Sequence, residues 1–363
     1  MHLDKIKINN FKNYNSIIFD FSPEVNFIFG KNGAGKTNLL DAIYYLSYTK
    51  SALNNTDYEN IRKGASYFKI EGTYNKNEKF YKCVLNENFK KYIYANDTPY
   101  KKIKDHIGKI PCVFITPYDI NLIRGYSKQR RRFFDILLSQ ISKDYLNILI
   151  DYNKLLKQRN TYLKNTLSIN NIDKDQLNTY NERLFKINEI INETRTKYID
   201  LFTLKFNKIF KILSESNITT SINYTSNFKI GKGIKQYNDD FKNDFYSNKT
   251  SFGIHHDDYS FKMNEEYIKK FGSQGQQKLF IISLKITEFF MLKNKSKKTP
   301  ILLLDDVFDK LDDKRVYLLL KYFNSENFSQ IFITDSIIGR MKKIKQINKK
   351  LKIIKIRNGI IDE

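Results

Sequence analysis

Two hydrophobic periods alternate along the 363-residue chain. Residues 3–29 alternate apolar and polar positions, which predicts two strands paired through a turn at Asn13–Ser16 and then a buried strand at Val25–Phe29. The same pattern returns in residues 66–115 and ends in the apolar run Ile110–Ile115. Further strands are expected at Tyr67–Tyr74, Phe80–Leu85 and Tyr92–Tyr94. The N-terminal part is therefore expected to form an antiparallel β subdomain.

After Gly125 the pattern becomes helical. An apolar stripe runs from Phe134 to Leu156, the segment Asn165–Asn178 is polar and turn-rich, and a second stripe runs from Leu184 to Ile209. Two long helices joined by a polar loop predict an antiparallel hairpin at the centre of an inserted helical lobe. Core packing is a sufficient explanation for both stripes.

A glycine-rich stretch lies between the apolar run Val25–Phe29 and a helical pattern that begins at Asn38. It consists of Gly30, Lys31, Asn32, Gly33, Ala34, Gly35, Lys36 and Thr37 and fits the P-loop pattern. A strand, a glycine bend and a helix start aim backbone N–H groups and the positive helix end at an anion. Lys36 is expected to reach the β/γ-phosphates, and the Thr37 hydroxyl to hold Mg²⁺. The stretch predicts a nucleoside triphosphate site.

Two acids, Asp305 and Asp306, follow the apolar strand pattern at Ile301–Leu304. A buried parallel strand delivers a carboxylate to its C-terminal end, where ligands bind in α/β sheets. Asp305 is expected to hold Mg²⁺, and Asp306 stands where a water-polarising catalytic carboxylate is needed beside Lys36. An apolar strand that ends in two acids is weak evidence alone, and the P-loop in the same chain strengthens it.

A second candidate anion site precedes the apolar helix Leu279–Leu292. Ser273 is a plausible helix cap, and Gly275 lets backbone approach an anion closely. A second anion site is redundant within one subunit. It becomes useful if Ser273 and Gly275 contact the γ-phosphate held by the P-loop of another subunit.

The formal net charge of +24 points to a polyanionic partner, although the abundant lysine also fits an AT-biased genome. Arginine is scarcer, so the run Arg130, Arg131 and Arg132 beside Lys128 is more informative. Arginine binds phosphate in a forked geometry, so this cluster is a candidate DNA-backbone contact. An exposed helix start, or ion pairs inside the lobe, explains it equally well.

Other features point to a soluble, cytoplasmic protein. Cys83 and Cys112 form no CxxC pair and are expected to be reduced, buried thiols. No signal peptide or membrane-length apolar run is apparent. His255 and His256 precede two acids, but neighbouring residues on a strand point to opposite faces, which disfavours a metal site and favours lobe packing.

The motifs resemble those of the ABC/SMC ATPases. Ser273–Gln277 resembles their signature motif, and Phe308–Asp312 resembles the D-loop, with Asp312 as its last acid. Within that class the chain resembles the bacterial RecF family of DNA replication and repair proteins. This resemblance rests on Gly30–Leu46, Thr116–Asp135 and Gly253–Asp258, and the latter two stretches discriminate because the ATPase motifs are common to the class.

The resemblance implies an α/β fold: a P-loop ABC/SMC-like ATPase head with a mixed sheet and an N-terminal antiparallel β subdomain, plus an inserted mainly helical lobe. Residues 1–115 and 260–363 would form the ATPase lobe, and 116–259 the helical lobe. It also implies ATP and Mg²⁺ as cofactors, with Ser273, Gly275 and Gln276 completing the nucleotide site of a partner subunit. The implied partners are a second copy in the presence of ATP, double-stranded and gapped DNA at single-strand/double-strand junctions, and the RecO and RecR mediators that help load the RecA recombinase.

Three departures from the ABC pattern predict slow hydrolysis with ATP acting mainly as a dimer latch. Thr334-Asp335 stands where many members have a switch histidine, and Phe114–Asp119 lacks the glutamine of a Q-loop. Asp306 is one methylene shorter than the usual glutamate. Two alternatives stay open: the cytosolic ATPase of a transporter, and a structural SMC-like head with a short arm. A nuclease is disfavoured because no separate carboxylate cluster is visible.

Overall fold

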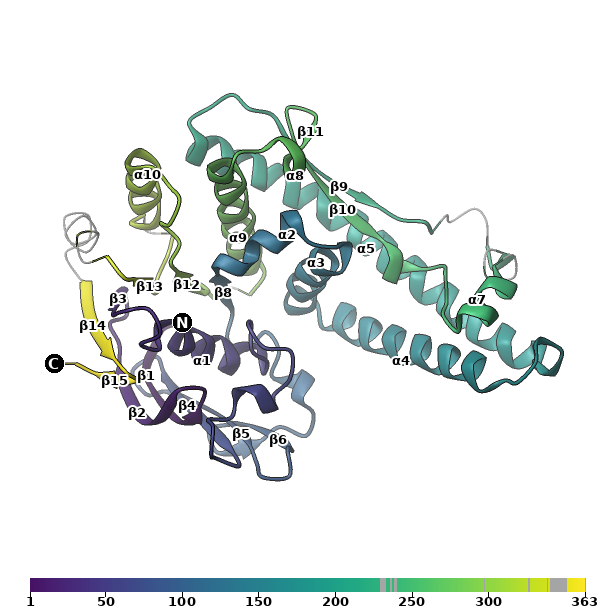
Figure 1. Cartoon of the computed structure of the whole chain (residues 1–363), viewed down its shortest axis with the longest axis horizontal. Coiled ribbons are helices and arrows are strands. Elements are labelled where there is room, and N and C mark those ends of the chain that lie inside the picture. The colour runs from purple at the N-terminus through teal and green to yellow at the C-terminus, as the bar shows by residue number, and fades with distance from the viewer. Residues whose placement is uncertain are drawn as a thin grey trace. The chain divides into compact units, whose positions relative to one another are not determined.

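The computed structural model describes residues 1–228, 233–235, 237, 240–296, 298–325, 327–337, 339 and 351–362. The chain divides into two compact units (Figure 1). The first consists of Met1–Ile120 and Gln274–Glu363, and the second of Asn121–Ser273. The boundaries predicted from the sequence fall after residues 115 and 259.

The first unit contains an antiparallel sheet with the strand order β2-β1-β4-β5-β6-β7. Its strands are β1 (Leu3–Phe11), β2 (Tyr14–Asp20), β4 (Phe68–Tyr74), β5 (Lys79–Leu85), β6 (Lys91–Ala95) and β7 (Thr98–Pro99). In β4 buried and half-buried positions alternate strictly, as a sheet with one covered face requires. The predicted turn at Asn13–Ser16 is wrong by two residues: Phe11 pairs with Tyr14, so the turn is Lys12-Asn13.

The second sheet of this unit has the order β15-β14-β3-β13-β12-β8. Its strands are β3 (Val25–Phe29), β8 (Cys112–Ile115), β12 (Ile301–Asp305), β13 (Ile331–Asp335), β14 (Leu351–Arg357) and β15 (Ile360–Ile361). All pairs are parallel except β14–β15. Asp335 is in register with Phe29, and Asp305 with Thr334, so the carboxyl ends of β3, β13 and β12 meet at one edge. This edge positions the candidate site.

Three α-helices and three 3₁₀ helices complete the described part of the first unit. They are α1 (Lys36–Tyr48), α9 (Gln274–Ser296), α10 (Asp313–Phe323), η1 (Tyr58–Asn60), η2 (Ile103–Asp105) and η3 (Pro117–Ile120). Helix α1 packs against strands of both sheets, and α9 packs against β8 and η3. Buried residues occur all round α9, as expected of a core helix. The predicted strand, glycine bend and helix around the P-loop are confirmed.

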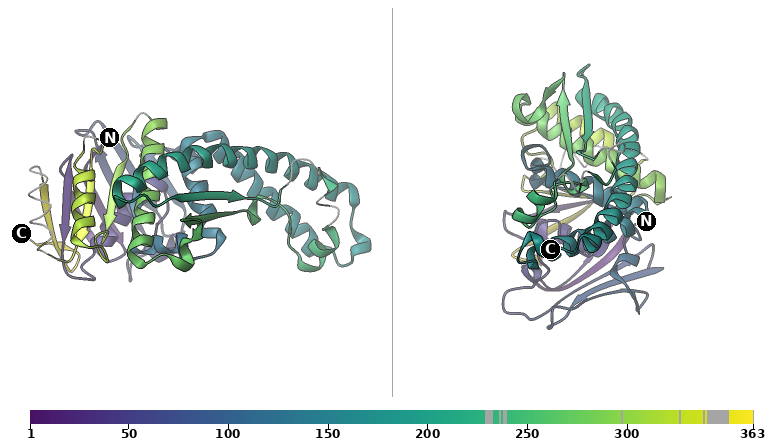
Figure 2. Two further views of the ribbon diagram at one scale, coloured as in Figure 1. Left: turned by 90° about the horizontal axis from the view of Figure 1, so that it is seen from above. Right: turned by 90° about the vertical axis from the view of Figure 1, so that its right-hand side faces the viewer.

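The second unit is mainly helical. Its helices are α2 (Asn121–Arg124), α3 (Ser127–Ile141), α4 (Lys143–Asn165), α5 (Lys174–Ser214), α7 (Phe241–Ser247), α8 (Ile268–Phe271), η4 (Ile169–Asn171) and η6 (Ile254–His256). The predicted helix hairpin is confirmed as α4 packed along the 41-residue α5 (Figure 2). The single helix expected from Phe134 to Leu156 is wrong. It breaks at Ser142, whose hydroxyl accepts the backbone N–H of Tyr145 at 3.2 Å and caps α4.

A small antiparallel sheet with the order β11-β10-β9 lies along this unit. Its strands are β9 (Thr220–Thr225), β10 (Asp258–Met263) and β11 (Glu266–Tyr267). Strand β9 packs on α5, and β10 packs on α3 (Figure 2). Residues 254–258 therefore join a 3₁₀ helix to a strand, and the expectation that His255 and His256 lie on a strand is wrong because both belong to η6.

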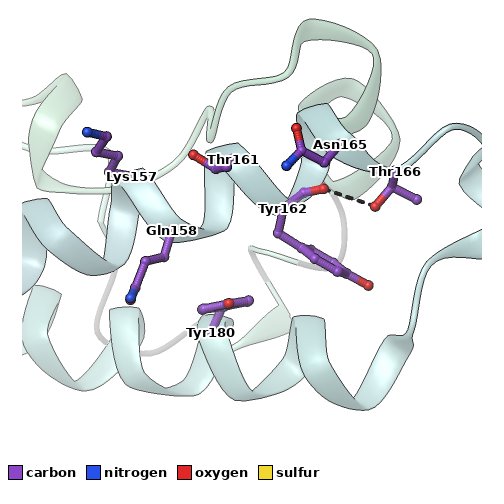
Figure 3. A pocket seen from close by; sticks show the side chains of 7 residues that line it. All are labelled: Lys157, Gln158, Thr161, Tyr162, Asn165, Thr166 and Tyr180. Atoms are coloured by element: carbon purple, nitrogen blue, oxygen red, sulfur yellow. Dashed lines mark hydrogen bonds between the residues drawn. The ribbon is translucent and has the colours of Figure 1, made fainter.

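The outer end of the hairpin carries an open pocket between α4 and α5 (Figure 3). It is lined by Lys157, Gln158, Thr161, Tyr162, Asn165, Thr166 and Tyr180. The rings of Tyr162 and Tyr180 are tilted to one another with centroids 6.0 Å apart, and the Thr166 hydroxyl donates to the Tyr162 carbonyl. No residue of this pocket belongs to the motifs singled out from the sequence.

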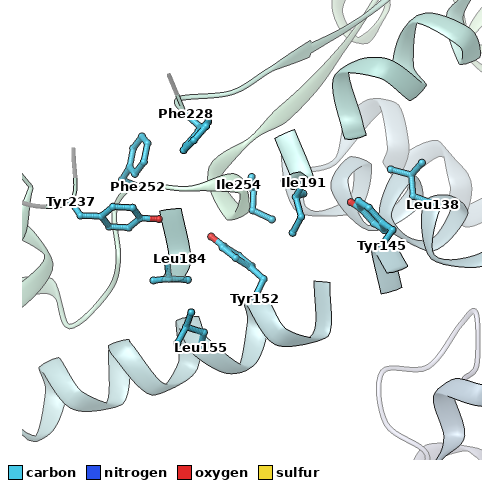
Figure 4. Packing of buried hydrophobic residues seen from close by; sticks show 10 residues of the cluster. All are labelled: Leu138, Tyr145, Tyr152, Leu155, Leu184, Ile191, Phe228, Tyr237, Phe252 and Ile254. Atoms are coloured by element: carbon cyan, nitrogen blue, oxygen red, sulfur yellow. The ribbon is translucent and has the colours of Figure 1, made fainter. Parts of the chain in front are cut away.

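The core of the second unit lies between the two long helices and the segments that cover them (Figure 4). It contains Leu138, Tyr145, Tyr152, Leu155, Leu184, Ile191, Phe228, Tyr237, Phe252 and Ile254. Tyr152 and Leu155 come from α4, Leu184 and Ile191 from α5, and Ile254 from η6. The stripes predicted from the sequence supply the helical half of this core, and three aromatic residues together with Ile254 from later in the chain supply the rest.

Cys83 and Cys112 are free and buried, as expected. No helix among the described residues combines the length and the apolar character that crossing a membrane requires.

Candidate nucleotide site and its relatives

Two glycines of the P-loop fill positions where another residue would not fit. Gly35 has φ +114°, which favours glycine, and a Cβ there would lie 2.6 Å from Asn13 Nδ2. A Cβ at Gly30 would lie 2.3 Å from the Ile356 carbonyl oxygen of β14. The Tyr14 hydroxyl donates to the Gly35 carbonyl at 2.9 Å. The first hairpin and β14 thus hold the loop from outside.

Lys36 lies almost fully buried at the start of α1. Its ammonium donates to the Gly30 carbonyl at 2.7 Å and to the Lys31 carbonyl at 3.2 Å. The side chain therefore folds back over its own loop, where neutral carbonyl oxygens hold it. A cation held in this way remains available to phosphate oxygens, which bind it more strongly because they are charged.

Asp305 and Thr37, 268 residues apart in sequence, are brought together as predicted for a magnesium site. The Thr37 hydroxyl lies 2.9 and 3.0 Å from the two carboxylate oxygens of Asp305. Thr334 on β13 donates to Asp305 Oδ1 at 2.7 Å. Burial raises the pKa of Asp305, and the hydrogen bonds from Thr334 and Thr37 oppose that rise. A hydroxyl and a carboxylate at this spacing are hard oxygen donors that suit Mg²⁺.

Thr334 stands where the ABC pattern has a switch histidine, and its contacts show a different role. Besides bonding Asp305, its hydroxyl accepts the backbone N–H of Asp306 at 3.1 Å. Asp306 has φ 43°, a left-handed conformation that is uncommon for a residue with a side chain. Thr334 therefore fixes the backbone from which both carboxylates project.

Asp306 is half buried among other charges. Burial raises its pKa, as do the carboxylates of Asp335 and Asp309, while Lys36 and Lys278 lower it. Asp335 is buried at the end of β13 and accepts the Ile337 N–H at 2.8 Å. The predicted catalytic pair, Asp306 and Lys36, is thus electrostatically coupled, which is the arrangement that a water-polarising carboxylate beside a phosphate needs.

Lys278 is a site residue that the sequence analysis missed. It lies on α9, partly buried, within electrostatic reach of Asp309, Asp119, Asp306 and Asp305. Burial lowers its pKa, and these carboxylates raise it. The signal in the sequence was a lysine between the signature-like motif, which ends at Gln277, and the apolar pattern that begins at Leu279.

Asp119 follows β8, in the stretch where a Q-loop glutamine is absent. Its carboxylate accepts the backbone N–H of Thr116 at 2.6 Å and the Thr116 hydroxyl at 3.2 Å. The residue therefore caps η3 and at the same time adds negative charge opposite Lys278. The site contains more carboxylates than magnesium binding requires, and Lys278 offsets part of that charge.

The signature-like and D-loop-like motifs meet at the start of α9. A Cβ at Gly275 would lie 2.7 Å from an Arg315 guanidinium nitrogen and 3.9 Å from the Lys310 carbonyl. Asp312 caps α10 by accepting the Arg315 N–H at 2.8 Å. Gly275 and Gln276 belong to the first turn of α9, while Ser273 is the last residue of the second unit. Arg315 thus links the two motifs.

The arginine cluster lies at the start of α3 in the second unit. Arg130 forks onto Asp258 with distances of 2.8 and 3.0 Å, and Arg131 donates to the Asp257 carbonyl at 2.6 Å. Arg132 and Lys128 are exposed. Two of the four predicted DNA contacts therefore have partners inside the unit, as the alternative interpretation held, and the assignment to DNA stays a prediction for all four.

A buried ion-pair network, not foreseen from the sequence, joins the stretches Thr116–Asp135 and Gly253–Asp258. Arg195 on α5 pairs with Asp135 at 2.8 Å and with Asp257 at 2.8 Å. Tyr224 and Ser226 also donate to Asp257. Because an unpaired buried charge costs several kcal/mol, this network ties α3 and the 254–258 segment to the long helix.

The two histidines of the 254–258 segment serve this packing. His255 lies 2.6 Å from the Tyr152 hydroxyl and 2.8 Å from the Thr250 carbonyl. Burial lowers the pKa of His255 to about 4, so the imidazole is neutral at pH 7. Among the residues described here, no group of three or more His, Cys, Asp or Glu side chains could hold a metal ion.

The fold and the site define a P-loop ATPase head of the ABC/SMC class. Residues 2–95 match the family described as "RecF/RecN/SMC N terminal domain". The DNA replication and repair protein RecF of Cytophaga hutchinsonii is 39% identical over 351 residues, 96% of this chain and 93% of that protein. The protein of the same name from Flavobacterium johnsoniae is 41% identical over 346 residues, 95% of this chain and 96% of its own length. The chain belongs to the RecF family of DNA replication and repair proteins.

Solved structures agree with this assignment. A structure of the recombination mediator protein RecF with ATP, in the RecFOR pathway, is similar with a TM-score of 0.88 at 28% identity, covering 99% of this chain and 97% of that one. An SMC head domain from Pyrococcus furiosus is similar in fold alone, with a TM-score of 0.55 at 16% identity over 99% of this chain and 95% of that one. The interpretation as a transporter ATPase is therefore set aside.

Replacing Lys278 by Met is expected to strengthen the binding of a divalent cation in the absence of nucleotide. The change removes one positive charge from among the four surrounding carboxylates, so their attraction for a cation increases. The affinity for the cation should rise about fivefold at an effective dielectric constant near 40. Titration of Mn²⁺ followed by electron paramagnetic resonance measures this affinity.

Lys321→Met, which removes an exposed lysine from α10, is the control and should bind Mn²⁺ like the wild type. Unchanged or weaker Mn²⁺ binding by Lys278→Met would show that Lys278 does not offset the charge of the site.

Proposed function

We propose that this chain binds ATP and Mg²⁺ at the P-loop and uses the nucleotide to hold two copies together on DNA. The observation that carries the proposal is the hydroxyl–carboxylate contact between Thr37 and Asp305, beside Lys36, at the carboxyl edge of a parallel sheet. The backbone of Gly30–Thr37, together with Lys36, would hold the phosphates. Thr37 and Asp305 would hold Mg²⁺, which supplies charge neutralisation at the β- and γ-phosphates when bound.

The second half of the site is proposed to come from another copy. Ser273, Gly275 and Gln276 supply a hydroxyl, a backbone without a Cβ and an amide at a helix start, which suit a γ-phosphate. Gly275 places no side chain at the N-terminus of α9, and the Arg315 guanidinium beside it adds positive charge. The relative solved with ATP, 28% identical, supports ATP as the nucleotide.

Hydrolysis is proposed to be slow, well below the median enzyme turnover of about 10 per second. Asp306 is a short carboxylate whose neighbours Asp335 and Asp309 disfavour its charged form. The Thr334 hydroxyl bonds the backbone of Asp306 and the carboxylate of Asp305. It therefore does not take the place of a histidine that would contact the γ-phosphate. ATP would therefore act mainly as a latch, released after a slow chemical step.

The proposed nucleic-acid partner is double-stranded or gapped DNA, contacted at single-strand/double-strand junctions. The net charge of +24 supports a polyanionic partner. Within the arginine cluster, Arg132 and Lys128 are the exposed residues and are proposed to contact the backbone, with Arg130 and Arg131 bracing the helix that carries them.

RecO- and RecR-type mediators and assistance in loading recombinase are proposed from family membership. The solved relative is described as a recombination mediator in the RecFOR pathway. A cytoplasmic location is proposed with them, since the chromosome and ATP of a bacterium are there.

The proposal predicts that Ser273→Arg blocks ATP-dependent pairing and leaves ATP binding nearly intact. The P-loop that holds the nucleotide is untouched, while a bulky side chain enters the position that would meet the second copy. Sedimentation velocity with and without ATP reads the pairing, and fluorescence of an ATP analogue reads the binding. Ser247→Arg, at an exposed serine of α7, is the control. ATP-dependent dimers that persist in Ser273→Arg would refute the shared site.

A second prediction concerns DNA. Arg132→Gln should weaken binding to gapped DNA for every sequence and lower the slope of log affinity against log salt by about one unit, because one phosphate contact is lost. Fluorescence anisotropy over a salt series measures the slope. Arg131→Gln should leave the slope unchanged, since its guanidinium is engaged by Ser127 and the Asp257 carbonyl. A changed slope for Arg131 and none for Arg132 would reverse this assignment.

A further inference from the structure

The long helix α5 has two unlike faces. Its buried residues lie on one stripe, which packs against α4 and β9. They are Leu177, Asn181, Leu184, Asn188, Ile191, Arg195, Ile199, Phe202, Phe206, Ile209, Phe210 and Leu213. At 100° per residue these positions share one side of the helix, so the opposite side faces away from the core of its own unit.

On that opposite side, exposed apolar residues recur every 11 residues. Ile190, Leu201 and Ile212 succeed one another at this interval, and their side chains are 47%, 47% and 56% exposed. Leu204, one turn beyond Leu201, is 63% exposed. Eleven residues make three turns at about 3.67 residues per turn, so a side chain repeated at this interval stays on one line of a nearly straight helix.

Lysine repeats at the same interval. Lys186, Lys197 and Lys208 each stand four residues before one of these apolar residues, and all three are exposed. Arg183 and Lys211 are exposed close by, and the acids Glu182, Glu193 and Asp200 are exposed along one margin of the face. We name Lys186, Ile190, Lys197, Leu201, Lys208 and Ile212 the α5 stripe. It is about 39 Å long, from 26 residues at a rise of 1.5 Å each.

Scattered exposed apolar residues are ordinary on protein surfaces, but a line of them in register with lysines is not scattered. A solvated helix face needs no large aliphatic side chains, and Leu201 and Leu204 on adjacent turns form a continuous apolar contact. Among the residues described, the ion pairs of α5 are those of Arg195 with Asp135 and Asp257, and the three lysines of the stripe take part in none. Both the charge and the apolar surface are thus available to a partner.

We propose that the α5 stripe docks an acidic, amphipathic helical segment of a partner protein, whose apolar residues recur every 11 residues between acids. Charge complementarity selects this occupant, because the stripe carries three lysines in register. A second copy of α5 would set lysine against lysine. A DNA backbone would satisfy the lysines but leave Ile190, Leu201 and Ile212 against charged phosphates. The surface goes beyond the nucleotide-dependent function and does not depend on it.

The test uses the full chain and a synthetic peptide of about 27 residues, acetylated and fluorescently labelled, with Leu and Glu on one face at 11-residue spacing. Fluorescence anisotropy measures its affinity at low salt and again at high salt. The wild-type chain should bind it, and Lys186→Glu/Lys197→Glu/Lys208→Glu should bind it at least about tenfold more weakly. The matched control is Lys154→Glu/Lys157→Glu/Lys164→Glu, which reverses three exposed lysines of α4 and should bind like the wild type.

A second variant and two further peptides separate the contributions. Leu201→Asn/Leu204→Asn should also weaken binding about tenfold, because the apolar anchors are lost. A peptide with Ser in place of Leu should bind the wild type poorly. A peptide with Lys in place of Glu should bind the triple Glu variant better than the wild-type chain, which shows that the variant is folded and that the charges meet.

Five outcomes would overturn the proposal. The wild-type chain could fail to bind the acidic peptide, or the triple variant could bind it equally well. The serine peptide could bind as tightly as the leucine peptide, which would leave only a general cationic surface. Duplex DNA could lose as much affinity in the triple variant as the peptide does, which would assign the stripe to nucleic acid. Sedimentation could show self-association that the stripe variants abolish, which would assign it to a second copy.

Discussion

The carboxylate of Asp305 is the contact on which the nucleotide site depends. It ends the buried strand β12 (Ile301–Asp305), receives the Thr37 hydroxyl from the start of α1, and receives the Thr334 hydroxyl from β13. These three residues come from distant parts of the chain, and a parallel sheet brings them to one edge. Burial makes the carboxylate costly to ionise, so two hydroxyl donors are needed to keep it ready for a cation.

The surroundings of this carboxylate support the proposal that ATP acts as a latch and is hydrolysed slowly. Asp306 projects from a left-handed backbone that Thr334 fixes, and Asp309 and Asp335 add negative charge around it. Asp119 adds negative charge near Lys278. Lys36 and Lys278 are the cations that offset this charge. Phosphates would draw Lys36 away from its loop carbonyls, which leaves Lys278 as the lysine facing the carboxylates. We therefore propose that the site binds a cation readily and polarises water weakly.

Much of this architecture could be predicted from the sequence because its signals are local. The P-loop, the apolar strand before Asp305 and the helix hairpin each depend on residues adjacent in the chain or on a simple period. The break at Ser142 was missed because the apolar stripe continues through it while a single hydroxyl caps the next helix. The turn at Lys12-Asn13 was misplaced because Tyr14 fits a strand or a turn equally well.

Pairings between distant residues could not be predicted. Arg195 binds Asp135 and Asp257, which are 60 and 62 residues away in the sequence. No residue next to Arg195 in the sequence indicates that its charge is buried. Through Arg195 this network joins Thr116–Asp135 to Gly253–Asp258 within the second unit. Lys278 escaped notice for the same reason, since its four carboxylates come from β8–η3, β12 and the segment before α10.

The most direct measurement is the magnesium dependence of ATP binding by Asp305→Asn. Asparagine can still accept the Thr37 and Thr334 hydroxyls but offers the metal no negative charge. If Asp305 holds the cation, Mg²⁺ should tighten binding of a fluorescent ATP analogue to the wild-type chain and leave its affinity for Asp305→Asn at the metal-free value. An undiminished magnesium effect in Asp305→Asn would place the cation elsewhere and contradict the account.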